Sequence, residues 1–75
     1  MTTVDPRGMR IDRLYGLLEH NDPLLATSIW HRVDGFARYP AKSATERATA
    51  ADKLIQDLRA ALKAAGVDDQ AVKAA

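Results

Sequence analysis

A chain of 75 residues without cysteine is long enough for one small domain, and it can have neither disulfides nor thiolate metal sites. Its net charge of +1 argues against non-specific adhesion to nucleic acid or membranes as its main role. Hydrophobic residues make up 47% of the sequence, but alanine supplies many of them, so we expect a thin core.

The first predicted helix covers about residues 9–20, after a lead-in over residues 1–8. Asp5 and Pro6 would suit an earlier start, as cap and first helical residue, but Gly8 argues against it. The apolar residues of the helix fall on one broad arc at 100° per residue, the pattern of an amphipathic helix. That arc consists of Ile11, Leu14, Tyr15, Leu17 and Leu18.

The middle and the end of this helix carry less regular signals. Gly16 costs about 1 kcal/mol relative to alanine in a helix interior, and either close packing or a bend would explain it. Asn21 suits the left-handed position that follows many helices. His20 falls in the last turn, where the helix dipole favours a cation. The first helix is therefore predicted to end at about residue 20.

A second helix is predicted over residues 22–38. Asp22 followed by Pro23 is a strong start signal, since the carboxylate caps free N–H groups and proline fits the first helical position. Gly35 follows an aspartate, and this pair is a turn signal. The next two residues, Phe36 and Ala37, still fall on the apolar face, so the helix is predicted to continue. Pro40 forces the stop, because the residue before a proline avoids the α region. One face carries Leu25, Ala26, Ile29, Val33, Phe36 and Ala37, and the other carries Thr27, His31, Asp34 and Arg38.

The longest predicted helix covers residues 43–65 and opens with a capping box of Ser43 and Glu46. A strict two-in-seven apolar stripe would favour a dimeric coiled coil, whereas the wider stripe here favours packing against the two preceding helices. Its alanine-rich first half allows close approach, and Gly66 with Val67 is typical of a Schellman stop. The stripe consists of Ala44, Ala48, Ala51, Ile55, Leu58, Leu62 and Ala65, widened by Leu54 and Ala61.

A short C-terminal helix is predicted over residues 68–75, capped by Asp68 or Asp69. It is too short to be stable alone, so it must dock, with Val72 as its anchor. The sequence therefore predicts an all-α fold, a small three-helix bundle with a short fourth C-terminal helix. We expect one helical domain over residues 1–75.

Little in the sequence supports catalysis or metal binding. His20 and His31 belong to no recognisable triad or nucleophile elbow. The i, i+4 spacing of helical metal ligands is absent, and the scattered glycines form no phosphate-binding loop. We therefore expect a protein that is not an enzyme and that uses no metal, cofactor or small-molecule substrate.

Positive charge and aromatic residues gather between residues 29 and 47. Arginine combined with tryptophan and tyrosine is typical of the residues that dominate binding at protein interfaces. Phe36 lies on the predicted core face, and the tryptophan lies at its edge, where it serves either as a cover for the core or as a binding anchor. The predicted partner-binding site consists of Trp30, Arg32, Arg38, Tyr39 and Lys42.

These observations favour a structural or adaptor subunit that docks into a larger protein assembly, such as a phage particle or a regulatory complex. Arginine exceeds lysine, aspartate exceeds glutamate and alanine is abundant, a bias typical of GC-rich genomes. With no apolar stretch long enough for a membrane and no signal peptide, we expect a cytoplasmic protein, or a virion protein if phage-encoded.

Two alternatives remain open. The first two predicted helices have about the lengths of a helix-turn-helix DNA-binding regulator. The outer face of the second helix carries little positive charge, however, and Asp22 at its start would repel phosphate. The other alternative is a dimer that self-associates through the predicted helix over residues 43–65.

Overall fold

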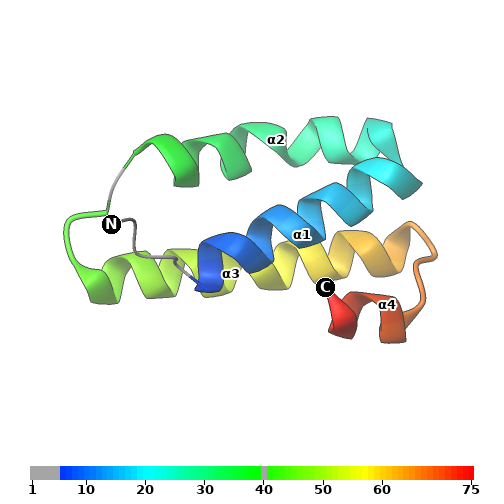
Figure 1. Ribbon diagram of the computed structural model, residues 1–75. Helices are drawn as coiled ribbons and strands as arrows, with labels where there is room; N and C mark the ends of the chain where they lie inside the picture. Colours follow the sequence, from blue (N-terminus) through cyan, green and yellow to red (C-terminus); the bar gives the residue numbers. More distant parts are fainter. Residues whose placement is uncertain (1–5, 40) are drawn as a thin grey trace.

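The computed structural model describes residues 6–39 and 41–75, and each of the four expected helices is present. The helices are packed as predicted, three against one another and a short fourth at the C-terminal end, so the all-α fold is confirmed (Figure 1). Within the described residues, no helix has both the length and the apolarity to cross a membrane. The helices are α1 (Pro6–Asn21), α2 (Pro23–Arg38), α3 (Ala44–Ala64) and α4 (Asp69–Ala74).

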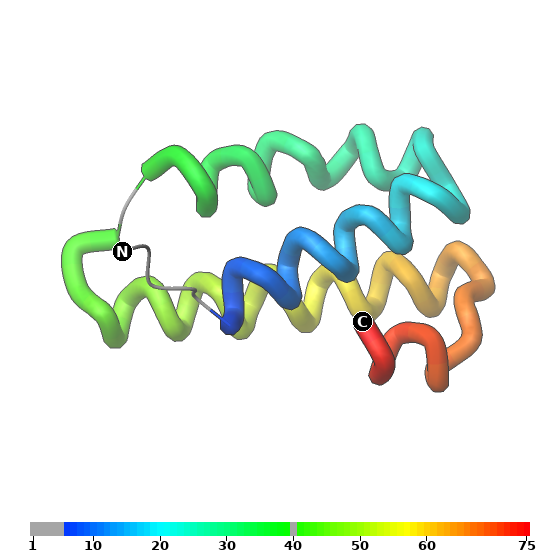
Figure 2. The backbone as a smooth tube through the Cα atoms, viewed as in Figure 1, coloured from blue at the N-terminus to red at the C-terminus, as the bar shows by residue number. Residues whose placement is uncertain are grey.

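α1 is the central helix of the bundle. It lies between α2 and α3 and packs extensively against both, whereas α2 and α3 contact each other far less (Figure 1). The chain reverses after α1 and again after α2, so α2 runs antiparallel to its two neighbours (Figure 2). We expected the helix over residues 43–65 to be the one that packs between the other two. The helix in that central place is α1 instead. The broad apolar arc of α1 gives it two faces to bury.

The core is built mainly from leucine and isoleucine side chains of α1 and α3. The prediction placed Ile55 in the apolar stripe of α3 and Leu54 on its flank. In the structure Leu54 is buried and Ile55 is only partly buried. The buried positions of α3 follow one another from Ala51 to Leu62 in steps of three, four and four. This total advance of eleven residues matches three turns of a straight α-helix better than a heptad repeat does. The side chains that are completely buried are Ile11, Leu14, Leu18, Leu58 and Leu62.

The boundaries of α1 differ from the prediction at both ends. The helix begins at Pro6 rather than at residue 9, so the earlier start that Gly8 was thought to disfavour is the one observed; the alternative cap Asp5 lies outside the described residues. Asn21 is the last residue of α1, and its Nδ2 donates to the Leu17 carbonyl at 2.8 Å. No described residue other than glycine has a positive φ, so the left-handed prediction for Asn21 was wrong. A Cβ at Gly16 would meet nothing within 4 Å, so close packing does not explain that glycine.

Asp22 and Ser43 cap the next two helices as predicted. Asp22 Oδ1 accepts from the Leu25 N–H at 3.1 Å, and Ser43 Oγ accepts from the Glu46 N–H at 3.1 Å. Asp22 is also the single residue between α1 and α2. A connection this short forces the two helices into a tight hairpin.

α3 ends in the predicted Schellman motif. Gly66 has a φ of 81°, a conformation that costs other residues about 1–2 kcal/mol. The Val67 N–H donates to the Leu62 carbonyl and the Gly66 N–H to the Lys63 carbonyl, both at 3.0 Å. This turn directs α4 back along α3, where Val72 is buried as its anchor.

Candidate functional site

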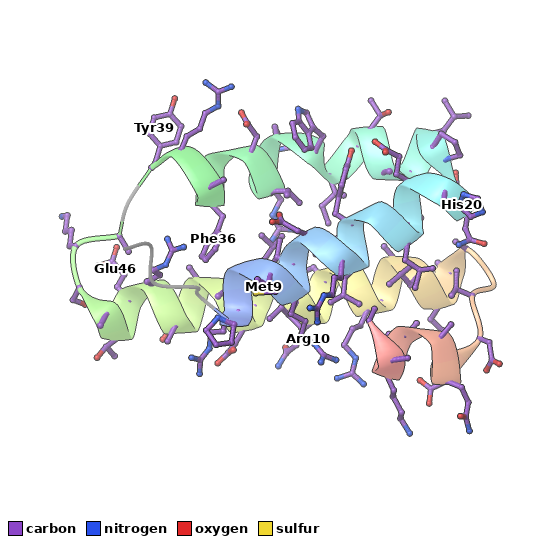
Figure 3. The ribbon with its side chains drawn as sticks, viewed as in Figure 1. Met9, Arg10, His20, Phe36, Tyr39 and Glu46 are labelled. Carbon is purple, nitrogen blue, oxygen red and sulfur yellow. The ribbon has the colours of Figure 1, made fainter. Side chains whose placement is uncertain are left out.

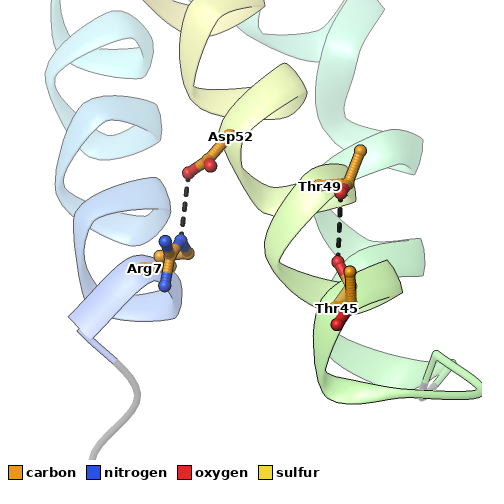
Figure 4. Close-up of polar contacts among 4 residues, drawn as sticks. All are labelled: Arg7, Thr45, Thr49 and Asp52. Atoms are coloured by element: carbon orange, nitrogen blue, oxygen red, sulfur yellow. Dashed lines mark hydrogen bonds and ion pairs between the residues drawn. The ribbon is translucent and has the colours of Figure 1, made fainter.

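One end of the bundle is not closed by α1. Arg7 in the first turn of α1 pairs with Asp52 at 3.0 Å, so α1 begins beside the third turn of α3 (Figure 4). Beyond that level α3 continues toward its start through Thr49 and Thr45, which are joined by a hydrogen bond from the Thr49 hydroxyl to the Thr45 carbonyl at 3.0 Å. We call residues 34–39 and 41–50 the open end. None of these residues is buried.

A hollow of about 430 Å³ lies between α2 and α3 at the open end. Phe36 points from α2 toward α3, whereas Tyr39 stands on the outer side of the chain at the end of α2 (Figure 3). The floor is apolar and the rim is mostly basic, with one carboxylate. The lining residues are Arg32, Phe36, Tyr39, Ala41, Glu46, Arg47, Ala50, Lys53 and Leu54.

The guanidinium group of Arg47 covers the Phe36 ring, with its central carbon 4.3 Å from the ring centroid. A cation–π contact of this kind contributes about 0.5–1 kcal/mol where water has access. In the core, by contrast, the large side chains Ile11, Leu14, Leu18, Leu58 and Leu62 are completely buried. At the open end a charged side chain covers an aromatic ring, and a partner that displaced it would gain the apolar surface of the ring.

Arg32 forms an ion pair with Asp57 across the border between the core and the open end. The pair joins α2 to α3, and its side chains are 40% and 38% exposed. At this exposure such a pair contributes at most about 1 kcal/mol to stability. Its main effect is to hold the Arg32 guanidinium in place on the rim of the hollow.

The structure brings only part of the predicted site together. Arg32 and Tyr39 both line the hollow, and Tyr39 is 75% exposed. Trp30 is 48% exposed and lies on the other flank of α2, with its ring centroid 5.2 Å from that of Tyr15 on α1. It therefore partly covers α1 and does not face the hollow. Lys42 is exposed on the connection between α2 and α3, outside the lining of the hollow.

Arg38 is held within its own helix. Its Nε donates to Asp34 Oδ1 at 2.8 Å, one turn earlier on the outer face of α2. This hydrogen bond and the charge of Asp34 raise the pKa of Arg38. The pair neutralises the outer face of α2 at the point where the sequence predicted a basic contact.

Sequence reasoning missed the contribution of α3 to this site. It assigned Phe36 to the core, and the side chain does pack against the core but is only half-buried. Arg47 was read as part of the local positive excess and not as a contact of Phe36. The available signal was that the first turns of α3 offer mainly alanine and threonine, which cannot cover a phenylalanine ring.

No group of three or more histidine, aspartate or glutamate residues in the described ranges is arranged to hold a metal ion. Comparisons with protein-family models, curated proteins and solved structures found no match to this chain. The case for a function therefore depends on the geometry and chemistry of the open end.

Proposed function

We propose that the protein is a non-enzymatic helical adaptor that docks into a larger protein assembly through its open end. The observation that carries this proposal is the half-covered Phe36 ring in a hollow rimmed by Arg32, Arg47 and Tyr39. Aromatic and arginine side chains are enriched at protein interfaces, and apolar pockets among them take the anchors of the partner.

The lining of the hollow indicates the chemistry of the partner. Arg47, Lys53 and Arg32, which is paired with Asp57, place basic groups at the hollow, and Glu46 places one carboxylate there. A partner helix with an apolar anchor and acidic residues beside it would complement this surface. The anchor would displace Arg47 from Phe36 and cover the ring. Trp30, Arg38 and Lys42 lie outside the hollow and would contribute at the rim of a wider interface.

The composition bias toward arginine, aspartate and alanine is the ground for assigning that assembly to a high-GC bacterium or one of its phages. In that setting the adaptor would act in the cytoplasm as part of a regulatory complex, or in a virion as part of the particle. Both settings require a stable protein contact and no catalysis.

Two observations favour this proposal over the alternatives. α1 and α2 form an antiparallel hairpin, whereas the helices of a helix-turn-helix cross at about 90–120°. The apolar stripe of α3 that would join two copies is buried against α1 of the same chain. Dimerisation through that stripe would require the bundle to open.

The test is affinity capture from a lysate of the source organism with the wild-type chain and three variants. Phe36→Ala and the double variant Arg38→Ala, Tyr39→Ala change the open end and its outer rim. Leu24→Ala is the control, because Leu24 is 85% exposed at the opposite end of α2. We expect the first two variants to lose one specific protein that the wild type and the control both retain.

Capture of the same proteins by all four chains would contradict the proposal. Sedimentation of the purified chain addresses self-association separately. A monomer is expected, and a mass twice that of the chain would favour the dimer instead. Circular dichroism of each variant must show a folded helical protein before its capture result is counted.

A further inference from the structure

Four arginines gather on a second surface, formed by α1 and α3 on a different face from the open-end hollow. Arg7, Arg10 and Arg13 follow one another at every third residue of α1, and Arg59 comes from α3. Together they line a hollow of about 510 Å³. Arg10 lies on the side of α1 that faces α3 (Figure 3). We call these four residues the arginine cluster.

The arginine cluster differs from the other arginines in how its charges are balanced. Arg32 and Arg38 each pair with an aspartate, and Arg47 covers an aromatic ring. In the cluster, Arg7 pairs with Asp52. Within residues 6–39 and 41–75, no ion pair or side-chain hydrogen bond involves the other three members, which are Arg10, Arg13 and Arg59.

Three guanidinium groups without a carboxylate partner repel one another, so their convergence on one hollow destabilises the folded chain slightly. Arg10 is half-buried, which also removes part of its hydration. An anion bound from outside would relieve both effects. The planar donor fork of a guanidinium group fits a phosphate with two hydrogen bonds.

The rest of the wall limits what kind of anion fits. Besides the arginines and Asp52, the hollow is lined by Pro6, Ile55 and Ala75. Among the described residues that line it there is no aromatic side chain, so they offer neither the anchors of a protein hot spot nor the stacking platforms of a single-strand binding site. Binding at this surface would depend on charge and hydrogen bonding alone, which is how proteins contact the phosphates of a duplex.

The spacing of the cluster agrees with a row of phosphates. At a rise of about 1.5 Å per residue, the α1 positions of the cluster extend over about 9 Å of helix axis. Each strand of a DNA duplex carries one phosphate per about 3.4 Å of its axis, so the row covers about three phosphates. We infer that the arginine cluster binds the phosphate backbone of a duplex nucleic acid. This inference goes beyond the docking of a protein at the open end and does not depend on it.

This surface is not the one that a helix-turn-helix would use, because the outer face of α2 takes no part. With about three phosphate contacts and a net charge of only +1, binding is weak and falls steeply with salt. An adaptor of this kind would hold a protein at its open end and duplex nucleic acid on the face of α1 and α3.

The test measures binding of the whole chain to a fluorescent 20-base-pair DNA duplex over a range of salt concentrations. The logarithm of the association constant should fall against the logarithm of salt with a slope of about −3. Arg10→Gln, Arg13→Gln and Arg59→Gln should each reduce affinity at low salt severalfold, and each should make the slope shallower by about one. Arg38→Gln is the matched control, since it removes the same charge from the outer face of α2.

Three results would overturn the inference. The first is duplex binding no stronger than background at low salt. The second is an equal loss of affinity in the Arg38→Gln control, which would mean that only total charge matters. The third is equally tight binding of polyglutamate with the same dependence on Arg13, which would assign the surface to an acidic protein. Far-UV circular dichroism verifies that each variant is folded. If Arg10→Gln unfolds the chain, the variants Arg13→Gln and Arg59→Gln, at exposed positions, are compared with the wild type instead.

Discussion

The two halves of α3 lie in opposite environments. From Leu54 to Leu62 the helix packs against α1, and Leu58 and Leu62 are completely buried. From Ala44 to Ala50 the same helix buries no residue, because α1 begins only beside Asp52. The core half supplies the apolar burial that stabilises the fold. The open end buries no residue, so we expect it to contribute less to stability, and the proposed docking surface then lies apart from the stabilising half of the helix.

The largest expected effect is that of Leu58→Ala in the core half. Leu58 is completely buried, so truncation removes its burial and leaves a cavity, at a cost of about 2–5 kcal/mol. A domain of 75 residues has a total stability of about 4–11 kcal/mol, so much of it would be lost. Urea unfolding followed by circular dichroism measures the loss. A loss below about 1 kcal/mol would mean that this half is not the core.

A smaller loss is expected for Phe36→Ala at the open end. The ring is half-buried and covered on one face by Arg47, so its removal should cost about 1–2 kcal/mol. The same urea experiment compares the two variants directly. If Phe36→Ala destabilised the chain as much as Leu58→Ala, the open end would be part of the core. The proposed difference between the two halves of α3 would then be wrong.

Breaking the ion pair at the border between the two regions should have a smaller effect again. Arg32→Gln, Asp57→Asn and the double variant form a cycle that isolates the pair. Both side chains are more than a third exposed, so the coupling free energy should be about 0.2–1 kcal/mol and should decrease in high salt. A salt-independent coupling of more than about 2 kcal/mol would instead make the pair a main link between α2 and α3.

The smallest effect concerns Tyr15, on the flank of α1 that faces Trp30. Burial, helped by the charge of Glu19 and a hydrogen bond with it, raises the pKa of the Tyr15 hydroxyl above 10.0. The folded chain therefore holds this proton more tightly than the unfolded chain does. The resulting stabilisation is complete when the pH is below the pKa of Tyr15 in the unfolded chain. It is lost as the pH rises through the higher pKa of Tyr15 in the folded chain. The free energy of unfolding should fall from about pH 10 upward.

Tyr15→Phe removes this titration and provides the control. The difference in unfolding free energy between the wild type and Tyr15→Phe should change above about pH 10 and stay constant at neutral pH. Lysine titration affects both chains alike and cancels in the difference. A difference that stays constant up to high pH would contradict the burial of the hydroxyl.

Local signals in the sequence were sufficient to predict the helices and most of their ends. Asp22 with Pro23, Ser43, and Gly66 with Val67 each act within one turn of the chain, so their effect needs no knowledge of the fold. The central position of α1 was not predictable in this way. It depends on which apolar faces meet in space, and the stripes of α1 and α3 are similar in width.

The candidate site was predicted only in part for the same reason. Residues near in sequence, such as Trp30 and Arg32, lie on opposite flanks of α2 because successive residues turn by about 100°. The alanine-rich start of α3 was expected to bring helices close, yet α2 and α3 make few contacts, and the hollow lies there instead. The arginine cluster joins Arg13 to Arg59 across 46 positions of sequence, a distance over which no spacing rule operates.

Amide hydrogen exchange along α3 in the free protein tests the contrast between the two regions most directly. The amides of Ala48, Thr49 and Ala50 are in the open end, whereas those of Leu58 and Leu62 are in the core half. Local opening of a poorly packed segment requires less free energy than global unfolding, so the open-end amides should exchange at least about tenfold faster. Equal protection along the whole of α3 would contradict an open end and, with it, the proposed docking site.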